Sequence, residues 1–405
     1  YGLSGTPVAG FDNLLVTLRW LPLLQREIHL EDVRLKTPWA DLLLDKTSGL
    51  NLVSAVVAPG KEAPDSSPPT DLDDLPVNFV CRSFQLIGGR LSFKLTDDNM
   101  QAHADGITLS ASADLKAKQA GLDLDVSRAR YQDKTIQPPG AHITLKARLN
   151  GDKLHLPTAT ISAGEITAKL NGYLDALTRE PVVDASLSIA SPLAELKEAL
   201  NIAGDYRGMA NADLRLEGAI ANPLARIGLT IDDGWFAGQP LDQFRLSIGL
   251  EDRLVTINDS ALKLADGTID LDGTADLRTA FPSGFLKPPA DMDAVTYTLS
   301  LVPDIPHLSP WLKSWMSMTG QLNGGIHLKG TGISPSAMSA RLTLDAKGRH
   351  LLAPGMDRPV DTDLKVSATM DQGKISIDQL NADTDGLKLS GTGRMDVNQR
   401  TLAGD

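Results

Sequence analysis

The stretch that decides the fold runs Gly208-Met209-Ala210-Asn211-Ala212-Asp213-Leu214-Arg215-Leu216-Glu217-Gly218 and alternates between apolar and polar residues. It returns as Gly320-Gln321-Leu322-Asn323-Gly324-Gly325-Ile326-His327-Leu328-Lys329-Gly330, and Pro223 and Pro335, which follow the two copies, keep the same separation of 112 residues. A short helical pattern precedes each copy. Repetition at a fixed period indicates modules stacked along a line rather than a single globule.

A second repeated block supports this interpretation. Leu154-His155-Leu156 returns 101 residues later as Val255-Thr256-Ile257, and a related form is Ile375-Ser376-Ile377. Each is followed by a turn, a second alternating strand and a glycine. We therefore expect an N-terminal region and three similar units. Their expected bounds are 1–104, with an acidic proline-rich loop at 58–76, then 105–190, 191–302 and 303–405.

Alternation with a period of two residues extends over most of the chain. In Phe244-Arg245-Leu246-Ser247-Ile248-Gly249-Leu250 every second residue is apolar. This pattern predicts an antiparallel sheet with one apolar face and one face in water. Glycine-containing turns are expected at strand spacing. They are Asn150-Gly151, Asp233-Gly234, Asp266-Gly267 and Asp385-Gly386.

Helical signals are few. Ser191 and Pro192 predict a helix over 192–203 with Ser191 as its cap, and Ser309-Pro310 predicts a second helix over 309–318. A third short candidate is 18–24, interrupted by Pro22. We expect less than a fifth of the chain to be helical, and the fold to be all-β.

Composition narrows the classes of function. Hydrophobic residues make up 42% of the chain but aromatic residues only 4%, which suits an aliphatic surface. The net charge of −12 disfavours nucleic acid and electrostatic adhesion to an anionic membrane. Cys81 is the single cysteine, so no disulfide can form within the chain, and we expect a small buried residue on a strand. No signal peptide or apolar run long enough to span a membrane is present, and an anchor outside this sequence is expected.

Residue patterns typical of catalysis or metal binding are missing. The seven histidines are scattered, and His29, His142, His155 and His327 fit solvent-facing strand positions. Pairs such as Asp123 and Asp125 follow from period two on a wet face, although paired carboxylates are also compatible with calcium binding or acid–base chemistry. No nucleophile elbow, phosphate loop or dinucleotide fingerprint occurs. We expect neither an enzyme nor a bound cofactor or metal.

A sheet with one apolar face must cover that face. The chain can do so as repeats of a closed β-sandwich, or as an elongated sheet curled into a taco-like β-groove whose apolar lumen takes up acyl chains. For the groove we predict lipid-binding residues at the apolar positions of the alternating strands. They are Leu154, Leu156, Leu170, Leu214, Leu216, Leu229, Ile231, Leu246, Ile248, Val255, Ile257, Leu262, Leu264, Ile269, Leu271, Ile326, Leu328, Leu342, Leu344, Leu364, Val366, Ile375, Ile377, Leu387 and Leu389.

The repeated unit resembles the AsmA-like family of Gram-negative envelope proteins, which includes TamB and YhdP. The resemblance lies in Leu214-x-Leu216-x-Gly218, the following Asn222-Pro223 and the strands up to Gly273, and again from Ile326 to Gly391. The segment from Trp20 to Leu30 looks like the family's opening after its membrane anchor. The resemblance implies an inner-membrane anchor, a periplasmic β-groove and bridge-like transfer of phospholipid toward the outer membrane. Some members are linked instead to outer-membrane protein biogenesis.

Three classes of function therefore stay open. The first is a periplasmic lipid-conducting groove whose partners are phospholipid acyl chains and the membrane that holds its anchor. The second is an envelope scaffold that aids outer-membrane protein assembly and binds a partner protein at a sheet edge. The third is a β-solenoid adhesin or polysaccharide enzyme, for which the sequence shows neither an aromatic ladder nor a carboxylate cleft.

Overall fold

The computed structural model describes residues 8–45, 49–50, 78–95, 100–133, 136, 139–177, 180–236, 239–312, 317–334, 337–396 and 401–404. In this part of the chain strands account for 72% of the residues and helices for 6%. The all-β prediction is confirmed. The predicted loop at 58–76 lies outside the described residues.

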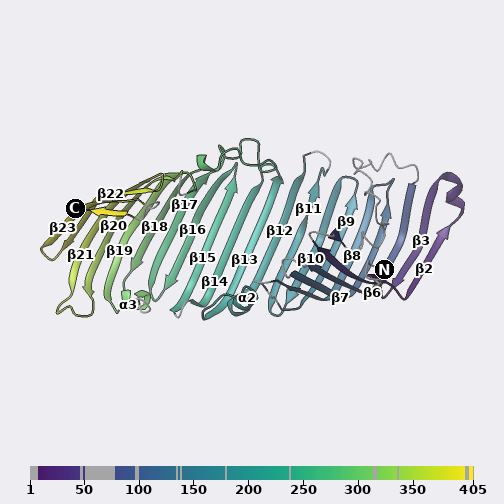
Figure 1. Ribbon diagram of the computed structural model, residues 1–405, viewed down its shortest axis with the longest axis horizontal. Coiled ribbons are helices and arrows are strands. Elements are labelled where there is room, and N and C mark those ends of the chain that lie inside the picture. The colour runs from purple at the N-terminus through teal and green to yellow at the C-terminus, as the bar shows by residue number, and fades with distance from the viewer. Residues whose placement is uncertain are drawn as a thin grey trace. The chain divides into compact units, whose positions relative to one another are not determined.

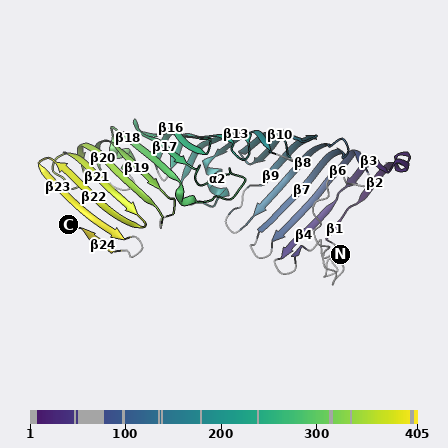
Figure 2. The same ribbon diagram turned by 90° about the horizontal axis from the view of Figure 1, so that it is seen from above.

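The contacts between residues divide the chain into two units, residues 1–203 and 204–405. Each unit is an open, curled sheet that does not close on itself in the described residues (Figures 1 and 2). The closed-sandwich alternative is therefore excluded for them. The expected boundaries at 104/105, 190/191 and 302/303 fall inside strands, so they mark periods of the sequence and not breaks in the sheet.

Unit 1 contains twelve described strands, one short α-helix and one 3₁₀ helix. The elements are β1 (Ala9–Gly10), β2 (Asn13–Arg19), η1 (Leu21–Gln25), β3 (Glu27–Lys36), β4 (Trp39–Asp45), β5 (Gly49–Leu50), β6 (Asn78–Leu95), β7 (Met100–Asp114), β8 (Gln119–Gln132), β9 (Ala141–Asn150), β10 (Lys153–Ala163), β11 (Ile166–Asp175), β12 (Val182–Pro192) and α2 (Leu193–Ala199). From β6 to β12 each strand pairs antiparallel with the next. The exceptions to antiparallel pairing are β3 and β4, which lie parallel to β6.

Unit 2 is built in the same way. Its elements are β13 (Tyr206–Ala219), β14 (Leu224–Phe236), β15 (Gln239–Glu251), β16 (Leu254–Leu264), β17 (Gly267–Asp276), η3 (Met292–Ala294), β18 (Thr296–Ile305), α3 (Leu308–Leu312), β19 (Thr319–Thr331), β20 (Ser339–Leu352), β21 (Val360–Asp371), β22 (Lys374–Thr384), β23 (Leu387–Asp396) and β24 (Thr401–Gly404). Each described strand pairs antiparallel with its neighbour in the sequence.

The sequence repeat returns as a structural repeat. The two copies of the opening motif form β13 and β19, which follow α2 and α3. Both strands shift register at an equivalent glycine, Gly208 with φ of 106° and Gly320 with φ of 124°. A second shared bulge lies in β10, β16 and β22, where register shifts between Leu156 and Ala159 and at the equivalent places of the other two strands. Equivalent bulges show that the repeat includes backbone irregularities as well as strands.

The helices differ from their predicted bounds. α2 ends at Ala199, and its N-cap is Pro192 without a side-chain cap, so the prediction of Ser191 as cap is wrong. The Ser191 hydroxyl is buried and donates instead to the carbonyl oxygen of Pro192. α3 runs to Leu312, and the next part of its predicted range, 313–316, lies outside the described residues.

Two further local predictions need correction. The third helix candidate, 18–24, is divided between β2, which continues to Arg19, and the 3₁₀ helix η1, in which Pro22 takes one of the first positions. Proline fits there because the first turn of a helix needs no N–H from it. Asp233-Gly234 is not a turn between strands, because both residues lie inside β14, beside the bulge at Gly208. The other three predicted turns do connect strands.

Candidate functional site

The cross-strand register brings the apolar residues of unit 2 onto one face. Residues that are paired directly across two strands point to the same side of a sheet. One row of such pairs crosses six strands, from β17 to β22. Its members are Leu271, Leu301, Ile326, Leu344, Val366 and Leu380.

A second row continues the same face toward β13. Leu214 pairs with Ile227, Ile227 with Ile248, and Ile248 with Ile257. Ile257 in turn pairs with Gly273, which shares the face of Leu271 two residues away. The face is therefore continuous within unit 2. We call it, with its counterpart in unit 1, the apolar face.

Unit 1 carries an apolar face of the same construction. A row of aliphatic residues crosses nine strands, from β2 through β3 and β6 to β12. Its members are Leu14, Leu35, Leu86, Leu109, Leu124, Leu145, Ala159, Leu170 and Leu187.

All the predicted lipid-binding residues lie on the apolar face of their own unit. Three belong to unit 1, Leu154, Leu156 and Leu170, and the others belong to unit 2. The prediction that alternating apolar positions share a face is confirmed by the register. Leu264 differs from the rest because it is buried, and little of its side chain is accessible there.

The sequence prediction missed other residues of the apolar face. Leu299 and Leu301 of β18 and Leu109, Leu124 and Leu145 of unit 1 belong to it. Their signal is present in the sequence, because each stands in an alternating strand. The repeats could also have found some of them, because Leu145 lies 101 residues before Leu246 and Leu299 lies 112 residues after Leu187.

The bulges determine which residues of a strand point to the apolar face. A regular strand would place residues two apart on one side along its whole length. In β16 the shift between Ile257 and Ser260 changes this parity, and Leu262 and Leu264 thereby join the face of Ile257. The extra residue of a bulge has this effect because it re-aims every side chain that follows it. β10 and β22 shift at the equivalent place.

The opposite face of each sheet is polar. The hydroxyls of Thr274 and Thr298 lie 2.8 Å apart across β17 and β18. The ammonium of Lys365 lies 3.4 Å from a carboxylate oxygen of Asp345, its direct cross-strand partner. These pairs are exposed, and exposed pairs of this kind contribute about 0–1 kcal/mol each. The polar face is therefore a solvated surface.

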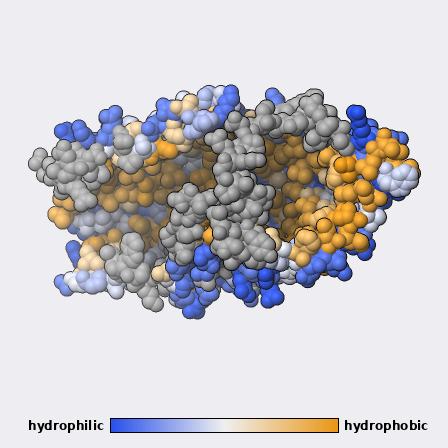
Figure 3. All heavy atoms as spheres, turned by 45° about the vertical axis from the view of Figure 1, so that its right-hand side comes forward, coloured by the Kyte–Doolittle hydropathy of each residue, from blue (hydrophilic) through white to orange (hydrophobic). Residues whose placement is uncertain are grey.

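The apolar face is uncovered in the described residues. In a sandwich core these side chains would be almost fully buried, but Ile227 is 40% exposed and Ile161 is 46% exposed. In unit 1 the face forms a pocket of about 430 Å³ between β6 and β11, lined by Phe93, Ala104 and Ile143 among others. Figure 3 shows hydrophobic residues in hollowed parts of the surface and hydrophilic residues along its upper and lower edges.

A larger pocket, of about 1020 Å³, opens on the polar face of unit 2. Its side chains include Thr256, Asp272, Lys329, Arg341 and Asp371, which carry both signs of charge. This mixture gives no single recognition chemistry. We therefore take the apolar face, which is chemically uniform, as the candidate site.

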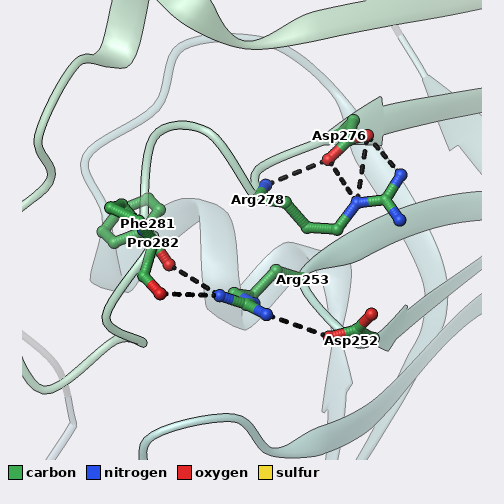
Figure 4. A network of polar contacts seen from close by, with 6 residues as sticks. All are labelled: Asp252, Arg253, Asp276, Arg278, Phe281 and Pro282. Atoms are coloured by element: carbon green, nitrogen blue, oxygen red, sulfur yellow. Dashed lines mark hydrogen bonds and ion pairs between the residues drawn. The ribbon is translucent and has the colours of Figure 1, made fainter.

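A connecting segment lies at one end of the strands of unit 2. Residues 277–291, which we call the rim segment, connect β17 to η3 and β18. Arg253, from the turn between β15 and β16, donates to the carbonyl oxygens of Phe281 and Pro282, each at 3.1 Å (Figure 4). The backbone N–H of Phe285 donates to the carbonyl oxygen of Ala221 at 2.8 Å, in the turn between β13 and β14. The rim segment, which itself connects β17 to β18, therefore contacts the β13–β14 turn and the β15–β16 turn at the same end of the strands.

The rim segment begins beside an ion pair. The guanidinium of Arg278 binds Asp276 through two nitrogens, with Nε at 2.9 Å from Oδ1 (Figure 4). These hydrogen bonds, together with one from the backbone N–H of Arg278, lower the pKa of Asp276 to about 2. Asp276 therefore stays ionised at any physiological pH, and its ion pair with Arg278 persists.

The candidate catalytic and metal-binding groups are not assembled. Asp123 binds Arg148 and Asp125 binds His142, so the two carboxylates are engaged separately. Among the described residues no group of three or more His, Cys, Asp or Glu could hold a metal ion. Cys81 is buried on β6, as predicted, and burial raises the pKa of its thiol.

No known protein family, curated protein or solved structure matches this chain. The function must therefore be inferred from the geometry of the apolar face. None of the helices in the described part of the chain is long and apolar enough to span a membrane.

Proposed function

We propose that this protein is a lipid-conducting groove of the AsmA-like type, which moves phospholipids through the periplasm between the inner and outer membranes. The observation that carries the proposal is the row of aliphatic side chains that crosses each sheet and stays uncovered. A face of this kind offers acyl chains a continuous apolar surface, while headgroups stay at the polar border.

The energetics favour acyl chains as the ligand. Each methylene group removed from water contributes about 0.8 kcal/mol, so releasing a 16-carbon chain into water costs on the order of 12 kcal/mol. A chain that slides along an apolar row avoids this barrier because it is never fully exposed. The aliphatic character of the rows suits this role, since no directional hydrogen bond would hold the lipid at one place.

The geometry gives less support to the other classes of function. A polysaccharide enzyme needs a pair of carboxylates in a cleft, and the candidate pair Asp123 and Asp125 is engaged separately by Arg148 and His142. A scaffold role in outer-membrane protein assembly requires a partner at a strand edge. Binding at an edge does not explain why the apolar rows are uncovered.

A photo-crosslinking experiment tests the proposal. A photoreactive residue is placed at Leu344, on the apolar face, or at its neighbour Thr343, on the polar face of the same strand. Leu109 and Ser110 form the matched pair in unit 1. After irradiation in a Gram-negative cell, mass spectrometry of the purified protein identifies attached lipid.

We expect phospholipid adducts at Leu344 and Leu109, and adducts at least about tenfold weaker at Thr343 and Ser110, because a bound chain contacts one face alone. Equal labelling of both faces, or protein adducts without lipid at the apolar positions, would overturn the proposal. Protein adducts alone would favour the scaffold function.

A further inference from the structure

A dense group of exposed apolar side chains lies at the β2 end of unit 1, where it shares Leu14 with the apolar row and extends beyond that row. It includes both faces of β2 and the connection to β3. Trp20 is 67% exposed and Leu24 is 79% exposed. The other exposed members are Leu14, Leu15, Val16, Leu18, Leu21 and Leu23. We call residues 20–24 the apolar tip.

The apolar tip is held in place by its backbone and not by burial. The N–H of Leu23 donates to the carbonyl oxygen of Trp20, and the N–H of Arg26 donates to that of Leu23. The carbonyl oxygen of Arg26 accepts from the N–H of Asn78 on β6. None of the residues of η1 is buried. The leucines therefore contribute little to folding, and their exposure calls for a partner.

The shape of the tip indicates a flat partner. η1 projects from the end of unit 1 beyond the strands in both ribbon views (Figures 1 and 2). A peptide or helix would need a groove to enter, whereas a projecting loop can insert its side chains into a soft planar surface. A lipid bilayer is such a surface.

The composition of the tip fits the interface of a bilayer. Between Asn13 and Arg26 the charged residues are Arg19 and Arg26, and no acidic residue occurs, although the whole chain carries a net charge of −12. Arg19 is ion-paired with Glu31 on β3. Tryptophan prefers the headgroup level, leucine the acyl region below it, and arginine the phosphates. The acidic remainder of the chain opposes broad adhesion, so contact would be confined to this end.

We propose that the apolar tip inserts into the surface of a phospholipid bilayer and holds the β2 end of unit 1 against it. The inference is independent of lipid conduction, because residues 20–24 lie outside both the predicted lipid-binding set and the apolar rows. If both proposals hold, the tip places one end of a lipid-binding face beside a lipid source.

Vesicle flotation tests the inference. The probe is vesicles of phosphatidylethanolamine and phosphatidylglycerol, mixed with the full chain or with the variants Leu24→Asp and Trp20→Ser. The matched control is Leu286→Asp, which changes a leucine of the rim segment that is 60% exposed. Thermal melting checks that each variant is folded.

We expect Leu24→Asp to lower the partition onto vesicles by about tenfold or more, because the variant removes one inserted leucine and adds a charge that the bilayer disfavours. Trp20→Ser should also lower it, and Leu286→Asp should leave it unchanged. The inference is overturned if the unaltered chain does not float with vesicles, or if Leu24→Asp floats equally well. Loss of a homodimer in Leu24→Asp, without vesicle binding by the unaltered chain, would also overturn it and assign the tip to a second copy.

The two proposals can fail separately. Lipid adducts at Leu344 report on the apolar face, whereas flotation reports on the tip. A chain that floats but carries no lipid adducts would retain the membrane contact and lose the conduction proposal.

Discussion

Ile257 and Leu271 lie on the apolar face of unit 2, on the neighbouring strands β16 and β17. We expect Ile257→Asp and Leu271→Asp to block lipid binding while leaving the fold largely intact. A carboxylate among acyl chains is strongly disfavoured, but on an open face water can still solvate it when lipid is absent. The loss of stability should be about 1–2 kcal/mol, the value of a partly buried aliphatic side chain.

The measurement combines thermal melting with photo-crosslinking to lipid at Leu301, the cross-strand partner of Leu271. Thr256→Asp is the control, because it places the same charge one residue away on the polar face. Lost crosslinking with a nearly unchanged melt fits an open groove. If both apolar-face variants unfold, the face must be covered in solution, and the main support for lipid conduction disappears.

At the scale of residues, the sequence predicts the orientation of side chains well. Alternation with period two is a direct consequence of strand geometry, so the sequence alone assigns Leu214 and Leu216 to one face. The turn predicted at Asp233-Gly234 is wrong, because an Asp-Gly pair supports positive φ both in a hairpin turn and in a bulge. Only the partner strand, with Gly208 opposite, decides between these two uses.

At the scale of elements, the bulge of β14, where Asp233 and Gly234 stand opposite Gly208 of β13, depends on that glycine. Gly208 has φ of 106°, and a Cβ atom there would lie 2.8 Å from the Cα of Gly234. We expect Gly208→Ala to destabilise the protein by on the order of 2 kcal/mol, because both the backbone conformation and the close approach disfavour a side chain.

Gly228→Ala, on the adjacent strand β14, is the matched control. A Cβ atom at Gly228 meets no atom within 4 Å, and alanine is favoured over glycine in a strand by about 0.5–1 kcal/mol. Urea unfolding of the two variants gives the comparison. Equal stability of Gly208→Ala and the unaltered chain would mean that the bulge does not exist in solution.

The sequence predicts the positions of the helices better than their lengths. It locates α2 and α3 correctly because each follows a strand and begins near a proline. It predicts that α2 continues to residue 203, but the backbone leaves the helix at Leu200, where the N–H groups that follow bond back to Glu198 and Lys197. Helix ends are set by such local competition, which periodicity does not report.

At the scale of the whole molecule, each strand of the long antiparallel runs contacts its sequence neighbours. Stability in such a chain is approximately a sum of strand stabilities and nearest-neighbour terms. We therefore expect local opening to occur without global unfolding. Hydrogen exchange at increasing denaturant should show several opening units in each sheet, with β2 exchanging before β7 and β8, because β2 pairs on one side with β3 and its residues are all exposed.

A single cooperative transition for all strands, with equal protection in β2 and β8, would contradict this expectation. The variant Gly208→Ala gives a second test. It should lower the protection of amide hydrogens first in β13 and β14 and leave that of β7 and β8 unchanged.

The class of the whole fold is predictable from the sequence because repetition and alternation are both visible in one dimension. The choice between sandwich and groove is not, since the two differ only in what covers the apolar face. The same limit applies to the candidate site, because the pattern identifies an apolar surface and leaves its ligand to experiment.

The neighbour-by-neighbour pairing also restricts how a protein of this design changes length over evolution. Removing one strand would make its two former neighbours run in the same direction, with a connection too short for a parallel crossover. Removing two consecutive strands restores the antiparallel order with an ordinary hairpin. The length of such a sheet is therefore expected to grow and shrink in steps of one hairpin, about 9–10 Å at a strand spacing of about 4.8 Å, and proteins of this design should differ by even numbers of strands.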